Sequence, residues 1–165
     1  MQQATAFQYV NVRGASDELT NGAVGGQVHR FAAGGTLLVG DAVFISAANT
    51  VNKSATVGDY ANFVGFVVGG DSNGFRTEDA VGTTAATSGQ GVMVQISGVA
   101  RAIVGATGFT AGTTNVAVAP SAATAGRVIP SAALDATIIA GRALGVPTTT
   151  QATAGSEVRV LIQHF

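Results

Sequence analysis

Apolar residues occupy every second position in two similar segments, GQGVMVQISGV and, at the C-terminus, GSEVRVLIQHF. Three aliphatic residues follow Gly89 at alternate positions, and three follow Gly155 with the same offsets. The six residues are Val92, Val94 and Ile96 in the first segment and Val158, Val160 and Ile162 in the second. Because successive side chains of a strand point to opposite faces, each segment predicts a half-buried β-strand.

A second shared feature precedes these strands in each half of the sequence. Asp59 stands six positions before Gly65, and Asp135 stands six positions before Gly141. An apolar run lies close to the glycine in both halves. The distance from that glycine to the glycine of the closing strand is 24 positions in the first half and 14 in the second. The first half therefore carries an insertion. The paired aspartates are more typical of turns that lead into strands than of acid-base chemistry.

Further upstream, LLVGDAVFI at 37–45 corresponds to FTAGTTNVAV at 109–118. The same order of strands and turns thus occurs twice, which predicts pseudo-repeats over about 35–101 and 107–165. Two copies are too few for a solenoid, which generally needs at least three units to bury a continuous core. We therefore predict an all-β protein in which residues 35–165 form a single compact domain, a β-barrel or β-sandwich-like fold with an internal pseudo-repeat.

Residues 1–34 lie outside the repeated pattern. TAFQYVNV predicts one strand with Phe7 and Tyr9 on the same face, and a polar, glycine-rich passage follows it. Two interpretations are open: an ordinary first strand with its loop, or an extended N-terminal arm that packs on a neighbouring molecule. Aromatic side chains dominate interface energetics. In the second interpretation we expect the contact to be made by Phe7 and Tyr9 with Val10 and Val12.

The remaining segments give weaker predictions. The run 35–48 is nearly continuous in apolar residues and predicts one strand buried on both faces. ANTVNKSATVG at 48–58 predicts a loop, and NFVGFVVGG at 62–70 predicts a strand. The strand that begins at Gly91 is expected to extend to Ala100 or beyond. PSAALDATIIAG reads either as a helix capped by Ser131 or as a loop.

Composition favours a protein that works in contact with other proteins. Charged residues make up 10% of the chain, well below the roughly 25% of an average soluble domain. The hydrophobic fraction is 47%, mostly Ala and Val, with 23 Gly and no Trp. Such a core predicts modest stability, because small side chains bury little apolar area. The weakly charged surface predicts an oligomer or a component of a lattice.

Several classes of function are disfavoured by the same composition. The net charge of −1 and the scattered basic residues give no basic face for nucleic acid. Apolar stretches are interrupted by Gly, Asn and Pro, so no membrane-spanning helix is expected. The chain has no Cys, which excludes disulfides and thiolate chemistry. The N-terminus lacks the pattern of a signal peptide, so we expect synthesis in a cytoplasm.

One motif suggests an enzyme. Gly70-Asp71-Ser72-Asn73-Gly74 matches G-x-S-x-G, the turn that carries the nucleophile of α/β hydrolases. That chemistry needs a helix directly after the serine, and the sequence that follows is a poor helix former. Asp135 and His164 would be the partners of Ser72 in a triad. The same residues are common in turns, and we interpret the motif as a turn.

Metal-binding patterns are weak. Oxygen ligands for calcium could come from Asp71, Asn73, Glu78 and Asp79, but their spacing is not that of an EF-hand loop. A solvated acidic loop is the simpler interpretation. The two histidines, His29 and His164, are too few for a zinc site without cysteines. We predict no catalytic, cofactor-binding or metal-binding residues.

Four segments together resemble the head decoration, or capsid cement, proteins of tailed bacteriophages. They are GGTLLVGDAVFISAANTVNKSA, NFVGFVV, SGQGVMVQISGVA and IIAGRALGVPTTTQATAGSEVRVLIQHF, which extend over about residues 34–165. The resemblance implies a small β-rich fold of the β-tulip type, commonly a homotrimer. It also implies a virion protein, assembled in the host cytoplasm, that binds the major capsid protein on the outside of an icosahedral shell and stabilises it. The long N-terminal segment and the insertion at 70–90 depart from the family pattern.

Two other functions compete with this one. A β-module that binds glycans or a cell surface is the first, although 6% aromatic residues and no Trp make a poor sugar platform. A serine hydrolase acting through Ser72 is the second and remoter one. The structural role in a virion agrees best with the low charge, the lack of a catalytic constellation and the N-terminal segment.

Overall fold

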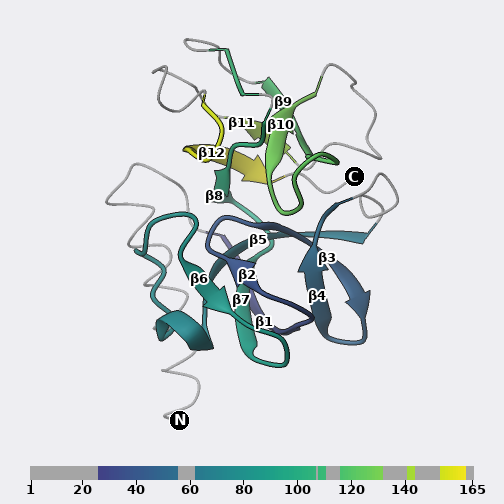
Figure 1. Ribbon diagram of the computed structural model, residues 1–165, viewed down its shortest axis with the longest axis vertical. Helices are drawn as coiled ribbons and strands as arrows, with labels where there is room; N and C mark the ends of the chain where they lie inside the picture. Colours follow the sequence, from purple (N-terminus) through teal and green to yellow (C-terminus); the bar gives the residue numbers. More distant parts are fainter. Residues whose placement is uncertain are drawn as a thin grey trace.

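Two groups of β-strands lie one above the other along the longest axis of the molecule (Figure 1). The computed structural model describes residues 26–55, 62–106, 108–110, 116–131, 141–143 and 153–162. Its elements are β1 (Val28–Ala33), β2 (Leu37–Leu38), β3 (Ala42–Ala47), β4 (Thr50–Lys53), β5 (Phe63–Gly70), the short 3-10 helix η2 (Asp71–Asn73), β6 (Thr84–Ala86), β7 (Gly91–Gln95), β8 (Val99–Ile103), β9 (Val116–Pro120), β10 (Val128–Pro130), β11 (Gly141–Ala143) and β12 (Glu157–Ile162). The prediction of an all-β fold is confirmed.

The first group is a closed barrel. Its strands follow the order β1-β4-β3-β5-β7, and β7 pairs again with β1 to complete the ring. The pairing of β1 with β4 is parallel, whereas the other neighbours are antiparallel. A separate two-stranded sheet of β2 and β6 lies beside this barrel.

The second group repeats the topology of the first. Its order is β10-β9-β11-β12-β8, with antiparallel neighbours throughout. A single parallel bridge between Val104 and Val128 joins its two outer strands. The two groups therefore correspond strand by strand, with the same relative directions. β8 corresponds to β1, β10 to β4, β9 to β3, β11 to β5, and β12 to β7. The predicted internal pseudo-repeat is therefore present as a duplicated strand order, but its copies run from β1 to β7 and from β8 to β12 and not over 35–101 and 107–165.

Matching hydrogen bonds fix the register of the two repeats. The amide of Gly89 donates to the carbonyl of Ala33 at 2.7 Å, and the amide of Gly155 donates to that of Val104 at 2.8 Å. Both glycines have φ near +83°, a left-handed conformation that favours a residue without a Cβ. The two strands that the sequence pattern paired are thus entered through the same turn.

The two glycines that follow Asp59 and Asp135 in sequence also occupy one structural position. A Cβ on Gly65 would lie 1.9 Å from the backbone oxygen of Gln95, and one on Gly141 would lie 2.3 Å from that of Leu161. Both distances are far inside van der Waals contact. At this point each repeat requires a close approach of neighbouring backbones, which only glycine permits.

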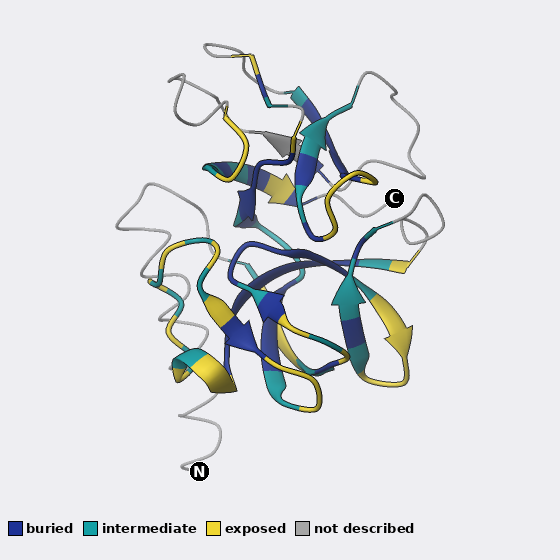
Figure 2. Cartoon of the chain, in the orientation of Figure 1, coloured by how far each residue is buried: buried dark blue, intermediate teal, exposed yellow. Residues whose placement is uncertain are grey.

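The cores are built from small aliphatic side chains. Buried residues occupy much of the strands in both groups (Figure 2). The first barrel encloses mainly Leu37, Val43, Val51, Val67, Val92 and Val94. The second core includes Val118, Val128, Val158 and Val160, and it also takes Ala42 and Phe66 from the outer face of the first barrel. Phe66 is fully buried and lies edge-on to Phe63, with ring centroids 5.5 Å apart. The two repeats therefore share one apolar interface.

Three local predictions were wrong. The run 35–48 is two strands, because Gly40 has φ +89° and turns the chain between β2 and β3. The expected loop 48–58 contains β4, of which only Val51 is buried, so its sequence looks polar. The strand from Gly91 ends before Gly98, where a φ of +79° separates β7 from β8.

Two further predictions concern the N-terminal segment 1–34 and the segment before Gly141. β1 lies inside the segment 1–34 that the sequence set apart, and it forms part of the closed barrel. Residues 132–140, predicted as a helix or a loop, lie outside the described residues.

Candidate functional site

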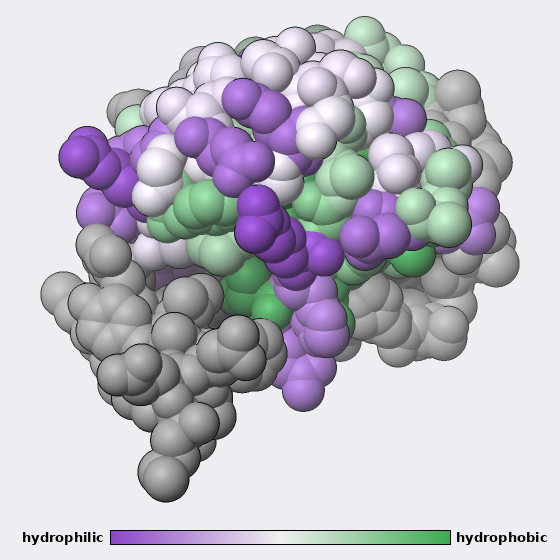
Figure 3. All heavy atoms as spheres, turned by 90° about the horizontal axis from the view of Figure 1, so that it is seen from below, coloured by the Kyte–Doolittle hydropathy of each residue, from purple (hydrophilic) through white to green (hydrophobic). Residues whose placement is uncertain are grey.

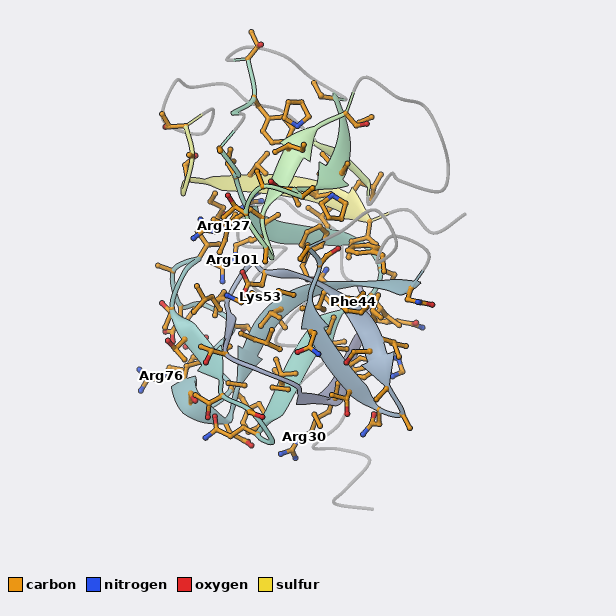
Figure 4. All side chains as sticks on the ribbon, turned by 45° about the vertical axis from the view of Figure 1, so that its right-hand side comes forward. Arg30, Phe44, Lys53, Arg76, Arg101 and Arg127 are labelled. Carbon is orange, nitrogen blue, oxygen red and sulfur yellow. The ribbon has the colours of Figure 1, made fainter. Side chains whose placement is uncertain are left out.

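A buried polar cluster lies where the two repeats meet. Asp41, between β2 and β3, is completely buried. Its Oδ2 accepts a hydrogen bond from the backbone amide of Leu38 at 2.7 Å and lies 3.1 Å from Nζ of Lys53. Figure 4 shows Lys53 in the same region as Arg127 and Arg101, between the two groups of strands. We call Asp41, Lys53, Ser54, Gly126 and Arg127 the junction cluster.

Opposing effects act on the charge of Asp41. Burial raises the pKa of this carboxyl group, because the ionised form loses its hydration. The hydrogen bond from Leu38 and the positive charges of Lys53 and Arg127 lower the pKa, but burial outweighs them. The other oxygen, Oδ1, has no hydrogen-bond partner among the described residues.

Gly126 brings the second repeat into the cluster. Its carbonyl accepts from the amide of Ala42 at 2.7 Å, and its amide donates to the carbonyl of Ser54 at 2.9 Å. A Cβ at Gly126 would lie 2.4 Å from Oδ1 of Asp41. The cluster is thus closed to solvent on the side of the second repeat. Its carboxylate is placed to join chain segments and is not presented to a ligand.

A second junction is made by Arg101 of β8, in the second repeat. Its guanidinium donates through Nη2 to the carbonyl of Thr77 and, at 2.8 Å, to that of Asp79. Nη1 lies 3.6 Å from Oε2 of Glu157 on the neighbouring strand. Thr77 and Asp79 belong to the insertion of the first repeat, so Arg101 ties that insertion to the second repeat.

The four candidate calcium ligands do not converge. Asp71 accepts from the amide of Gly91 at 2.6 Å and pairs with Arg30 at 3.3 Å. Asn73 accepts from the amide of Gly70, and it turns its side-chain nitrogen toward Oδ2 of Asp79 at 3.0 Å. Within the described ranges, no three acidic or histidine side chains gather as metal ligands would.

Ser72 does not sit at a nucleophile elbow. It lies within η2, a helix of three residues, and no α-helix follows it in the described chain. Its Oγ donates to Oε1 of Gln90 at 2.5 Å. The two predicted triad partners, Asp135 and His164, lie outside the described residues. His29 is exposed on β1.

Sequence reasoning missed an aromatic and basic pair on the surface of the first barrel. The guanidinium carbon of Arg30 lies 5.1 Å from the centre of the Phe75 ring. Arg30 is 66% exposed and Phe75 is half-buried. Phe75 has φ +59°, which is unusual for a bulky residue. The resemblance of VHR at 28–30 to VAR at 99–101 was the available signal, because it aligns Arg30 with Arg101.

The predicted contact residues of the N-terminal segment, Phe7, Tyr9, Val10 and Val12, lie outside the described residues. As for membranes, none of the helices in the described ranges has the length and apolar character that a crossing requires.

The geometry therefore defines a class: an all-β protein with a duplicated strand order, closed into a barrel in the first repeat, whose buried polar groups join its own segments. No family model and no curated protein matches the chain in sequence. Among solved structures, the chain is similar to the head fiber gp8.5 N base of bacteriophage phi29, with a TM-score of 0.50 and 13% sequence identity. The match covers 83% of this chain and 93% of that one. At this identity, the similarity shows a shared fold.

Proposed function

We propose that the chain is a structural protein of a phage virion that binds the outside of an icosahedral capsid and stabilises it. The observation that carries the proposal is the fold, which is shared with the base of a phage head fiber over most of both chains. The segments that resemble capsid decoration proteins point independently to the same location.

The internal chemistry supports a binding role over catalysis. Asp41, Asp71 and Ser72 are engaged in bonds that hold the chain together. The low charge agrees with a surface that other proteins cover. We propose the major capsid protein as partner and a homotrimer as the assembly. Many weak contacts repeated over a symmetric shell add up through avidity, so no single contact needs to be strong.

The experiment uses shells of the virus that encodes the chain, purified without it. The chain is added back, bound copies are counted by cryo-electron microscopy, and the temperature at which the shells release their DNA is measured. We expect binding at symmetric sites on the outer surface and a higher release temperature. Shells that take up no chain would refute the proposal, as would shells that bind it without any gain in heat or osmotic resistance. The mass of the free chain in solution tests the trimer separately.

A further inference from the structure

Two arginines occupy the same position in the two repeats. Arg30 of β1 stands opposite Met93 of β7, and Arg101 of β8 stands opposite Arg159 of β12. These strand pairs correspond in order and direction, and the preceding valines, Val28 and Val99, correspond as well. A difference in what the two guanidinium groups contact is therefore a difference in their surroundings and not in the fold.

Arg101 shows which contacts an arginine at this position makes when a loop of the other repeat lies beside it. It pairs with an acid of its own repeat, Glu157. Its Nη2 also donates to two main-chain carbonyls, those of Thr77 and Asp79, which belong to the other repeat. With these partners in place its side chain is only 26% exposed. The arginine thus docks a loop by its backbone and is independent of the loop's side chains.

Arg30 has the first of these contacts and lacks the second. It pairs with an acid of its own repeat, Asp71, at 3.3 Å. No carbonyl among the described residues accepts from its guanidinium, and its side chain is 66% exposed. A guanidinium has five N–H donors in a fixed planar arrangement. Most of the donors of Arg30 therefore have no acceptor within the part of the chain that the structure describes.

The exposed guanidinium is nevertheless held in place. Gly91, on the neighbouring strand, leaves room for it: a Cβ there would lie 2.4 Å from Nη2 of Arg30. The ring of Phe75 lies 5.1 Å from its central carbon, within the range of a cation–π contact. In Figure 4 Arg30 lies at the foot of the first barrel. Seen from below in Figure 3, this end carries hydrophilic side chains beside apolar ones.

The backbone at Phe75 is strained. Its φ of +59° is one that L-residues with large side chains rarely adopt, and Gly74 before it is also left-handed. Strained residues that persist in a fold are concentrated at binding and catalytic sites. Phe75 lies in the insertion that the second repeat lacks. The strain thus belongs to a segment that the duplicated topology does not require.

We propose that Arg30 and Phe75 form the site at which the chain docks an exposed loop of the capsid shell. Arg30 donates to main-chain carbonyls of that loop, as Arg101 does to Thr77 and Asp79, and the ring of Phe75 covers an adjoining apolar side chain. The inference rests on the proposed function. A second copy of the chain would be the other occupant, through a head-to-tail contact that either closes into a ring or propagates into open chains, and Arg30→Ala would then abolish self-association.

The test compares three single substitutions by their affinity for shells purified without the chain. Arg30→Ala removes the donors. Phe75→Gly removes the ring and replaces it with the residue that tolerates a positive φ, so stability should hold or rise. Arg76→Ala is the matched control, since Arg76 is exposed in the same insertion and loses the same charge. Thermal unfolding of each variant verifies that it is folded.

We expect Arg30→Ala and Phe75→Gly each to weaken shell binding by about tenfold or more, as interface hot spots do, and Arg76→Ala to bind within about threefold of the wild type. If both test variants bind like the wild type, the docking site is refuted while the proposed function stands. Wild-type chain that binds no shell refutes both. Self-association in solution, as a closed ring or as open chains, that Arg30→Ala abolishes would identify a second copy as the occupant and overturn the proposal.

Discussion

Replacing Lys53 with methionine tests the physical account of the junction cluster. The substitution keeps most of the side-chain volume and removes the cation that lies 3.1 Å from the buried carboxylate of Asp41. Removing one partner of a fully buried ion pair costs about 3–5 kcal/mol. Lys53 is 28% exposed and Arg127 remains nearby, so we expect a smaller loss of unfolding free energy, about 2–3 kcal/mol at pH 7.

The loss should depend on pH in a definite direction. Without Lys53, the folded-state pKa of Asp41 rises further above its unfolded value. For a group raised in this way, the folded state binds more protons than the unfolded state between the two pKa values, so stability falls as the pH rises through that window. The difference between Lys53→Met and the wild type should therefore be large at pH 7 and shrink as the pH falls and Asp41 takes up its proton in both proteins.

Urea denaturation of both proteins at several pH values measures this difference directly. Comparing the two proteins at each pH isolates the contribution of the substituted pair. The double variant Asp41→Asn, Lys53→Met should recover part of the loss at pH 7, because it carries no buried charge. A difference that stays constant between pH 7 and pH 4, or a double variant less stable than Lys53→Met alone, would contradict the account.

Three further outcomes are expected. Gly141→Ala should lower the unfolding free energy by several kcal/mol in urea denaturation, because its Cβ would lie 2.3 Å from a backbone oxygen of β12. The control Gly82→Ala, in open space at φ +89°, should lower it by only about 1–2 kcal/mol. Equal losses in the two variants would contradict the packing argument. Arg101→Gln should release the insertion, so trypsin should cleave after Arg76 faster than in the wild type; an unchanged cleavage rate would show that the two carbonyl contacts do not hold it. Phe66→Ala should lower the unfolding free energy by about 3–5 kcal/mol. Because Phe66 joins both cores, the variant should also lose hydrogen-exchange protection in both repeats. A loss of protection confined to the first barrel would show that the cores are independent.

The duplicated pattern could be found in the sequence because glycine positions are imposed by geometry. Gly89 and Gly155 provide the same positive φ, and Gly65 and Gly141 provide the same close backbone approach. The close backbone approach excludes any side chain, and the left-handed φ strongly favours glycine, so both requirements remain visible as glycine spacing in the sequence. The alternating valines that follow are read in the same way, since the inward face of a strand must be apolar.

The rest was hidden for identifiable reasons. The strand β4 turns a single apolar side chain inward, so its sequence looks like a loop. The equivalence of β1 and β8 rests on two shared residues in strands that are far apart in the chain. Asp41 follows a glycine and looks like a turn residue, and only the fold brings Lys53 and Gly126 to it. Arg30 is more exposed than Arg101 because only Arg101 has the loop of the other repeat beside it, and no local sequence pattern records that difference.

The parallel pairing of β1 with β4 closes the first barrel, so that this barrel has no edge strands. A ring of this kind leaves no row of free amides and carbonyls within its described strands, so a foreign chain has nowhere to add itself by backbone pairing. Two such barrels brought together could not pair their described strands into one continuous sheet. Whatever this barrel binds must be distinguished by side chains and loop tips, which makes its partner choice open to change by single substitutions while the scaffold stays the same.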